Sequence, residues 1–270
     1  MLSLDHIIIR AEDPAATLAV LSERAGLPVL AEATQIGGLT SAIARAGTVD
    51  IEVLAIGDEP PDRPHGYGLG FVADRPITEA LTEIRAAGIP TSVPISARAG
   101  SGRDLRRFRA AQIGHLLADP FPISMSTRRP GLTDRLSERF GTMLGRIPAV
   151  ARAATRKAGA SMVVVTEYGF DAEAYRASCP AGPELLEVRV NTGDRLEAWS
   201  RLPLARSSSL RLDDAGSSPL LSLVLAANSE GSPEDFECGD VTFTFQSDVT
   251  GSKRHDDGWH RTGQRETQLP

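Results

Sequence analysis

The segment Ile8–Pro14, with the sequence IIRAEDP, recurs in altered form as GFVADRP at Gly70–Pro76. Each copy has the character of an apolar strand that runs into acidic residues and a proline, which is typical of the start of a helix. The helix that follows each copy is expected to end at a glycine, Gly26 in the first and Gly88 in the second. A strand and a helix at the same spacing, found twice, indicate an internal duplication.

Each copy continues with three further strand candidates that are separated by glycines and prolines. They are Val29–Thr34, Thr40–Arg45 and Val49–Ile56 in the first copy, and Thr91–Ser96, Leu105–Gln112 and Pro122–Ser126 in the second. The predicted unit is therefore strand, helix and three strands, or βαβββ, present twice in residues 1–127.

The remainder of the chain divides into three parts. Residues 128–160 carry arginines at helical spacing and predict a basic helical connector, whose exposed face is solvated or, alternatively, contacts a membrane surface or an acidic partner. Residues 161–247 predict a third βαβββ-like module, which begins with the apolar strand Met162–Thr166 and continues at Leu185–Asn191. Residues 248–270 have few apolar side chains and predict a disordered polar tail.

Composition restricts the function classes. The 270 residues include 41 % hydrophobic ones, enough for a core, and the two cysteines suit a reducing compartment, so we expect a cytoplasmic protein. No stretch approaches the roughly 20 apolar residues of a membrane-spanning helix. The net charge of −6 disfavours binding to nucleic acid, which requires basic surfaces. A small-molecule ligand is the expected partner.

Three stretches together resemble the glyoxalase-like domains of the vicinal oxygen chelate superfamily. They are LDHIIIRAEDP at Leu4–Pro14, VDIEVLAI at Val49–Ile56 and GYGLGFVADRPITEALTEIRAAGIP at Gly66–Pro90. The resemblance covers roughly residues 3–127. It implies an α/β (α+β) fold, in which repeated βαβββ modules form half-open mixed β-barrels with flanking helices around a small-molecule pocket. It is also compatible with a homodimer.

The resemblance points to His6 and Glu52 as metal ligands, because metal-using members of the superfamily take ligands from the first and last strands of a module. Alternation along the two strands directs both side chains to the same side. The apolar residues expected to line the pocket beside them are Leu4, Ile8 and Leu54. An imidazole and a carboxylate suit a divalent ion of iron, zinc, nickel or manganese.

The second module does not supply matching ligands, since Gly68 and Gly70 occupy its first strand. Aligning LLEVRVN at Leu185–Asn191 with the first strand places Glu187 opposite His6, so pairing of the third module with the first would add a second carboxylate. Three further residues are candidates for the same pocket: Glu167 as a base, with Tyr168 and Arg107 as ligand contacts.

Two hypotheses of function follow. The first is a metal-assisted lyase, isomerase or dioxygenase for an oxygen-rich substrate, in which His6 and Glu52 hold the metal and Glu187 or Glu167 acts as base. The second is a metal-free pocket that binds or sequesters a hydrophobic or aromatic small molecule.

Overall fold

The computed structural model describes residues 1–36, 39–57, 59–99, 106–114, 116–117, 161–180, 182–205, 209–214, 220–227 and 233–247. The predicted basic connector and the predicted polar tail lie outside the described residues. Among the described residues, no helix is both long enough and apolar enough to cross a membrane.

The first module has the predicted order of elements. Its elements are β1 (Leu2–Arg10), α1 (Pro14–Ala25), β2 (Val29–Ile36), β3 (Leu39–Ala46) and β4 (Val49–Ala55). Asp13 caps α1, because its carboxylate accepts hydrogen bonds from the first backbone N–H groups of the helix. Gly26, at a φ of 64°, ends the helix in the left-handed conformation that glycine adopts without strain. The segment Ile8–Pro14 is therefore the end of a strand that leads into a helix, as predicted.

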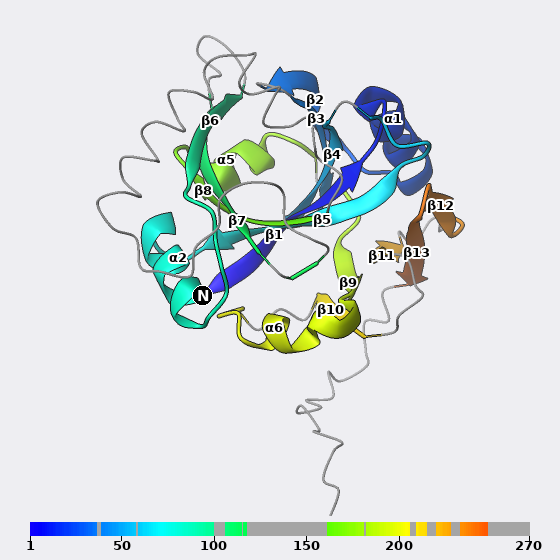
Figure 1. Ribbon diagram of the computed structural model, residues 1–270. Helices are drawn as coiled ribbons and strands as arrows, with labels where there is room; N and C mark the ends of the chain where they lie inside the picture. Colours follow the sequence, from blue (N-terminus) through cyan, green and yellow to red (C-terminus); the bar gives the residue numbers. More distant parts are fainter. Residues whose placement is uncertain are drawn as a thin grey trace, which may run out of the picture.

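The second module repeats this order. Its elements are β5 (His65–Ala73), α2 (Ile77–Ala86), β6 (Ile95–Ala99), β7 (Arg106–Ile113) and β8 (Met162–Tyr168). The two modules form one 8-stranded sheet in the order β2-β3-β4-β1-β5-β8-β7-β6. Within each module the first strand runs parallel to the last, and β1 joins β5 in an antiparallel pair. The sheet curls into a half-open barrel (Figure 1), which confirms the predicted fold class.

The last strand of the second module differs from the prediction. The strand beside β5 within this module is Met162–Tyr168, whose apolar sequence predicted the start of a third module. The strand predicted for that place, Pro122–Ser126, lies outside the described residues. β8 suits a central position because Val163 and Val165 are buried in the core. The long intervening segment concealed the pairing, since long insertions between strands cost little extra closure entropy.

The segment after β8 forms a second sheet, and this sheet does not repeat the module topology. After α5 (Ala172–Ala177) come β9 (Leu185–Asn191), the short helices η2 (Gly193–Arg195) and α6 (Leu196–Ser200), then β10 (Leu210–Asp213), β11 (Leu221–Ala227), β12 (Phe236–Cys238) and β13 (Val241–Ser247). The strand order is β10-β9-β11-β13-β12. β9 lies between β10 and β11 instead of beside the last strand, so the expected third βαβββ-like arrangement is wrong. The order of elements along a chain does not determine which strands pair.

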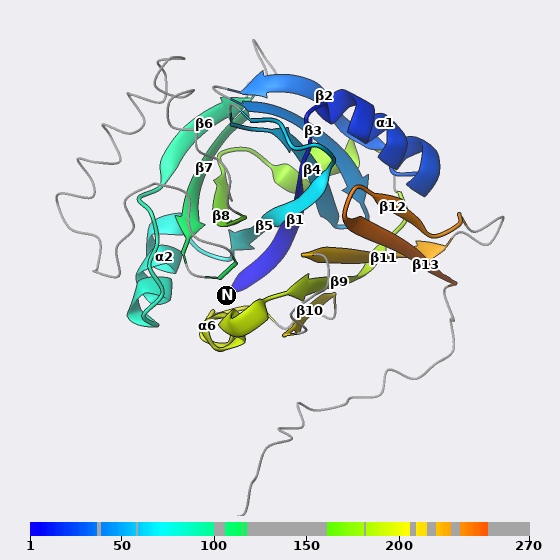
Figure 2. The same ribbon diagram turned by 45° about the vertical axis from the view of Figure 1, so that its right-hand side comes forward.

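The two sheets share one hydrophobic core. Figure 2 shows the second sheet beneath the first, with α6 below the N-terminal end of β1. Leu2 is buried and bonds through its backbone to Pro203 and Ala205, and the ring of Trp199 lies 6.3 Å from that of Phe71. Ile7 and Ile9 join this core together with residues of α1. The concave face of the first sheet lies on the other side from this core, and different side chains point toward it.

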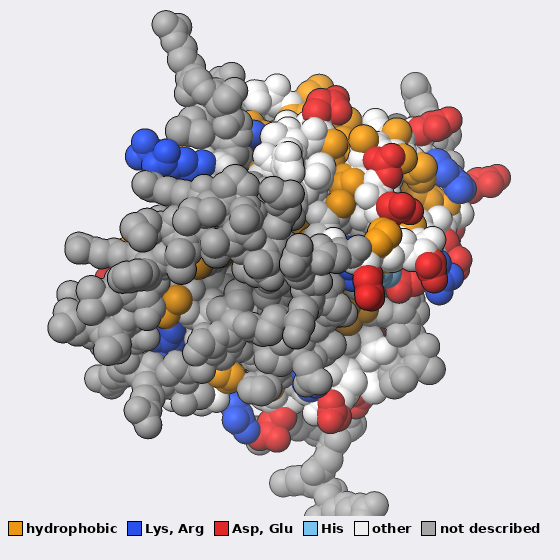
Figure 3. All heavy atoms as spheres, turned by 45° about the horizontal axis from the view of Figure 1, so that its top comes forward, with side chains coloured by type: hydrophobic (Ala, Val, Ile, Leu, Met, Phe, Trp, Pro, Cys, Tyr) orange, Lys and Arg blue, Asp and Glu red, His pale blue; other side chains and the backbone are white. Residues whose placement is uncertain are grey.

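The described surface carries charges of both signs. On the face drawn in Figure 3, acidic, basic and hydrophobic side chains lie interspersed over the described residues. This mixture agrees with the modest net charge of −6.

Candidate functional site

Two β-bulges decide which side chains reach the concave face of the first sheet. The pairing of β1 with β5 shifts between Leu4 and His6, where Asp5 is the extra residue, and again opposite Ile8 and Ile9, where Tyr67 is the extra residue. A bulge interrupts the alternation of side chains along a strand. Alignment of Ile8–Pro14 with Gly70–Pro76 places Asp5 opposite Tyr67, so both modules carry the bulge at the same position.

The bulges explain where the predicted apolar pocket residues lie. Ile8 and Leu54 share a small apolar cluster with Tyr67 and Val164, as expected for side chains on one face. Leu4 packs instead against the main core, so its prediction as a pocket residue is wrong. The bulge at Asp5 reverses the alternation between Leu4 and the residues that follow.

His6 lies between two carboxylates on the concave face. Its Nδ1 is 2.8 Å from Oδ2 of Asp5, and its Nε2 is 3.6 Å from Oε2 of Glu52. The other oxygen of Glu52 accepts a hydrogen bond of 2.6 Å from the hydroxyl of Ser41. Gly70 makes room for the imidazole, because a Cβ there would lie 2.0 Å from the ring. The sequence correctly paired His6 with Glu52 but missed Asp5 and Ser41.

Asp5 connects His6 to a wider polar cluster. Its Oδ2 also accepts a hydrogen bond of 2.5 Å from the hydroxyl of Tyr168, and its Oδ1 lies 2.6 Å from Nη2 of Arg176. Nε of Arg176 donates to Oδ2 of Asp50 at 2.8 Å. The other oxygen of Asp50 is buried and has no hydrogen-bond partner in the described part of the chain. Tyr168 thus lies in the predicted region, in contact with Asp5.

Arg176 reaches this cluster from α5, which lies within the curve of the first sheet (Figure 1). No residue of the helix itself is buried. The helix is held in place by polar contacts: the hydroxyl of Tyr175 donates to the carbonyl of Leu30 at 3.1 Å, and Arg45 donates to the carbonyls of Arg176 at 2.5 Å and Cys179 at 2.7 Å. The sequence predicts α5 as a short helix but carries no signal that this helix folds back onto the sheet.

The charges of the cluster shift its pKa values in opposite directions. Burial opposes a charged imidazole, but the hydrogen bond and charge of Asp5 and the charge of Glu52 outweigh it, so the pKa of His6 is raised. Burial would raise the pKa of Asp5, yet His6 and Arg176 hold it well below its usual range. For Asp50, burial outweighs Arg176 and raises the pKa of that carboxyl. The cluster therefore favours a His6 cation beside an Asp5 anion.

Glu167 and Arg107, two of the predicted site residues, do not share this face. Glu167 lies 2.9 Å from Nη1 of Arg109 and accepts a hydrogen bond of 3.2 Å from the backbone N–H of Ile77 at the start of α2. Arg107 is exposed and, by alternation, points to the same side as Arg109. The structure therefore gives Glu167 a structural setting at α2, away from His6.

Glu187 lies in the second sheet. It forms ion pairs with Arg189 and Arg211, the latter at 3.1 Å. The alignment that placed Glu187 opposite His6 assumed that β9 pairs with the first module. Because β9 pairs with β10 and β11 instead, the structure does not bring Glu187 to His6 and Glu52.

The cluster can be tested for its fit to a metal ion. A separation of 3.6 Å between His6 Nε2 and Glu52 Oε2 would allow both atoms to coordinate one ion at about 2.0–2.2 Å. Within the described residues, however, no group of three or more His, Cys, Asp or Glu side chains is placed to hold an ion. The second module has Gly68 and Val164 at the equivalent positions. Because catalytic zinc sites use three protein ligands, the described residues do not fit such a centre.

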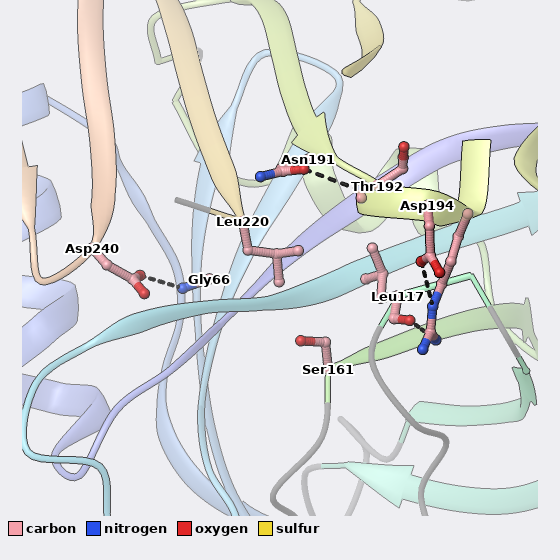
Figure 4. Close-up of a pocket in the computed structure, with 10 residues that line it drawn as sticks. Gly66, Leu117, Ser161, Asn191, Thr192, Asp194, Leu220 and Asp240 are labelled. Carbon is pink, nitrogen blue, oxygen red and sulfur yellow. Dashed lines mark hydrogen bonds and ion pairs between the residues drawn. The ribbon is translucent and has the colours of Figure 1, made fainter. Parts of the chain in front are cut away.

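A separate cavity of about 450 Å³ lies between the first sheet and the second (Figure 4). Its volume falls within the range of small-molecule sites. Asp240 is at one side of it, where its carboxylate accepts a hydrogen bond of 2.8 Å from the backbone N–H of Gly66. The lining residues are Gly66, Leu117, Ser161, Asn191, Thr192, Gly193, Asp194, Arg195, Leu220 and Asp240. None of them belongs to the His6 cluster, so this cavity is not the predicted pocket.

Comparison with known proteins identifies the fold. No protein-family model matches the chain, and no curated protein matches its sequence. A hypothetical protein from Staphylococcus aureus has a similar solved structure, with a TM-score of 0.61, 10% identity and coverage of 92% of this chain and 100% of that one. This likeness spans both sheets, and the first sheet pairs two βαβββ modules through their first strands. The chain has the vicinal oxygen chelate fold.

Two named enzymes give weaker structural matches to the vicinal oxygen chelate fold of this chain. A mutant of 4-hydroxymandelate synthase from Streptomyces coelicolor has a TM-score of 0.42 and 15% identity, covering 90% of this chain and 62% of that one. Methylmalonyl-CoA epimerase from Mycobacterium tuberculosis has a TM-score of 0.33 and 12% identity, covering 63% of this chain and 91% of that one.

Proposed function

We propose that the concave face of the first sheet binds a small carbonyl compound and that Glu52 and His6 move a proton in it without a bound metal ion. The observation that carries the proposal is the position of His6 between Asp5 and Glu52. Exposure distinguishes the two carboxylates: the side chain of Asp5 is 1% exposed and that of Glu52 is 22% exposed. Glu52 is therefore the carboxylate that a ligand can reach, and Asp5 is a positioning residue.

The proposed step uses Glu52 as base and His6 as hydrogen-bond donor. Oε2 of Glu52 takes a proton from the carbon next to a carbonyl group, and the electron pair of that C–H bond moves onto the carbonyl oxygen. The Nε2–H of His6 donates a hydrogen bond to this oxygen. Return of the proton from Glu52 to carbon gives an isomerase, and loss of a leaving group from the neighbouring carbon gives a lyase.

The apolar cluster beside Glu52 indicates the rest of the ligand. Ile8, Leu54 and Val164 are buried and form a small apolar cluster on the same face of the sheet as the charged groups. The hydroxyl of Tyr67 is buried in this cluster and has no partner among the described residues, and burial raises its pKa to about 12. A ligand that inserts an apolar body beside this cluster and brings one polar group to Tyr67 would suit it.

A second candidate function is binding or sequestration without chemistry. It is favoured by α5, which crosses the concave face and holds Asp5 and Asp50 through Arg176. If α5 keeps a bound ligand away from Glu52 and His6, the concave face binds the ligand without converting it to a product.

The test is the exchange of carbon-bound hydrogen with D2O, followed by proton NMR in a panel of 2-oxo acids, α-hydroxy ketones and 2-methyl thioesters. We expect wild-type protein to exchange a proton in one class and Glu52→Gln to be slower by about 10²–10⁴-fold. Glu79→Gln, the same change at an exposed position of α2, is the matched control and should exchange at the wild-type rate. Elemental analysis of the active sample checks the metal content.

Two outcomes contradict the proton-transfer proposal. Saturable binding of a panel compound without any exchange would favour sequestration. Stoichiometric metal in the active protein, lost together with activity in His6→Ala and Glu52→Ala, would favour the metal-assisted hypothesis.

A further inference from the structure

The carboxylates of Asp5 and Asp50 form a receptor for a hydrogen-bonding cation. They come from the neighbouring parallel strands β1 and β4, where His6 and Asp50 are directly paired. Both side chains are held by the sheet and are well buried, with 1% of Asp5 and 10% of Asp50 exposed. This pair of carboxylates is therefore part of the rigid sheet, whatever α5 does.

Arg176 occupies this receptor as an internal ligand would. Its Nη2 lies 2.6 Å from Asp5 and 2.8 Å from Asp50, and its Nε also donates to Asp50. One edge of the guanidinium thus contacts two carboxylates. Oδ1 of Asp50 still has no partner in the described part of the chain, so the receptor holds one acceptor that Arg176 does not use.

The element that presents Arg176 is a short helix with little buried surface. α5 has 6 residues, none of them buried, and apart from the contact of the Tyr175 ring with Phe170 its place depends mainly on polar contacts. A helix this short is not stable by itself in water. The chain is fixed again at Cys179, which is buried and whose Sγ lies 3.4 Å from the carbonyl of Val29. Displacement of the helix requires loss of the contacts of Arg45, Tyr175 and Arg176, but it does not require β8 before the helix or Cys179 after it to move.

Electrostatics restricts what can replace Arg176. Removing one partner of a buried ion pair leaves uncompensated charge, which is strongly destabilising. If α5 moves away, Asp5 and Asp50 need another cation that donates hydrogen bonds, and a guanidinium or a primary amine meets both requirements. An anionic ligand would instead need Arg176 in place.

We propose that the Asp5–Asp50 pair is a binding site for the guanidinium or amine group of a ligand, and that Arg176 on α5 is an internal competitor that the ligand displaces. The site then selects a carbonyl compound that carries such a cationic group. This inference rests on the proposed function only for the carbonyl part of the ligand. Binding of the cation involves no proton transfer, so either proposal can fail without the other.

The test is calorimetric titration with agmatine, which carries a guanidinium and an amine but no carboxylate. Arg176→Ala removes the competitor, and we expect it to bind agmatine at least about tenfold more tightly than wild type. Adding Asp50→Asn to this variant should abolish binding. Arg201→Ala is the matched control, because Arg201 is an exposed arginine that pairs with Glu197 beside α6 and does not contact α5, and this variant should match wild type.

Several results would overturn the proposal. They are the absence of saturable binding to folded Arg176→Ala, equal affinity in wild type and Arg176→Ala, or equal binding of tetramethylammonium, which cannot donate hydrogen bonds. If Arg176→Ala does not fold, hydrogen exchange of residues 171–180 in wild type decides. Faster exchange of this segment with agmatine supports displacement of α5, and unchanged exchange contradicts it.

Discussion

The two modules of the first sheet share their topology and their bulge but carry opposite chemistry. In the first module the bulge presents Asp5, followed by His6, with Glu52 on the last strand. The equivalent positions of the second module are Tyr67, Gly68 and Val164, which carry no charge. The same β-bulge thus presents charged side chains in the first module, the charged half of the sheet, and uncharged side chains in the second module, the neutral half. The comparison teaches that glycine in the second module makes space for the side chains of the first.

The largest effect is expected from Asp5→Asn. This change leaves the imidazole of His6 and the partly exposed guanidinium of Arg176 without their shared, buried carboxylate, so we expect the free energy of unfolding to fall by about 3–5 kcal/mol. Urea denaturation followed by circular dichroism measures it. A loss under about 1 kcal/mol would show that Asp5 does not hold the cluster together.

The next largest effect is expected at Gly70, which leaves room for the ring of His6. Gly70→Ala places a Cβ against the ring of His6, so the ring must move and we expect a loss of about 1–3 kcal/mol. The same urea series measures it. The double variant Gly70→Ala with His6→Ala should recover part of the loss, since the clash is then absent. Strictly additive losses in the two single variants would contradict the contact.

The pH dependence of stability tests the charge of His6. Because the folded state raises the pKa of His6, its contribution is fully present below the unfolded value of 6.5 and is lost as the pH rises through the folded pKa. The depressed pKa of Asp5 adds stability above 3.8 that is lost as the pH falls through its folded value. The difference in stability between wild type and His6→Gln should therefore shrink above neutral pH. A difference that grows with pH would contradict a protonated His6.

The smallest effect is expected at the equivalent position of the neutral half. The hydroxyl of Tyr67 has no partner among the described residues, so Tyr67→Phe should change stability by less than about 0.5 kcal/mol, or raise it slightly. Thermal unfolding at pH 7 measures it. A loss above about 1 kcal/mol would show that the hydroxyl is hydrogen-bonded in solution.

The sequence predicted the first module and the order of elements at the start of the second, because glycine and proline separate their strands clearly. It placed His6 and Glu52 near each other correctly, since β4 pairs with β1 and β3 without a register shift. It placed Leu4 wrongly and missed Asp5, because a bulge adds a residue without any distinct sequence signal. The role of Arg176 was not visible, since contacts between α5 and the first sheet join residues far apart in the chain. The strand that carries Glu187 was predicted correctly, but it pairs with β11 in the second sheet and not with the first module, so Glu187 lies away from the site.

The most direct test of the account is an NMR titration of the imidazole nitrogens of His6, assigned by comparison with His6→Gln. Because Asp5 and Glu52 flank the ring, we predict that both nitrogens stay protonated above pH 6.5 and that adding Zn²⁺ leaves their signals unchanged. Titration below pH 6.5, or a shift of the Nε2 signal on binding Zn²⁺, would contradict the metal-free cluster and restore His6 as a metal ligand.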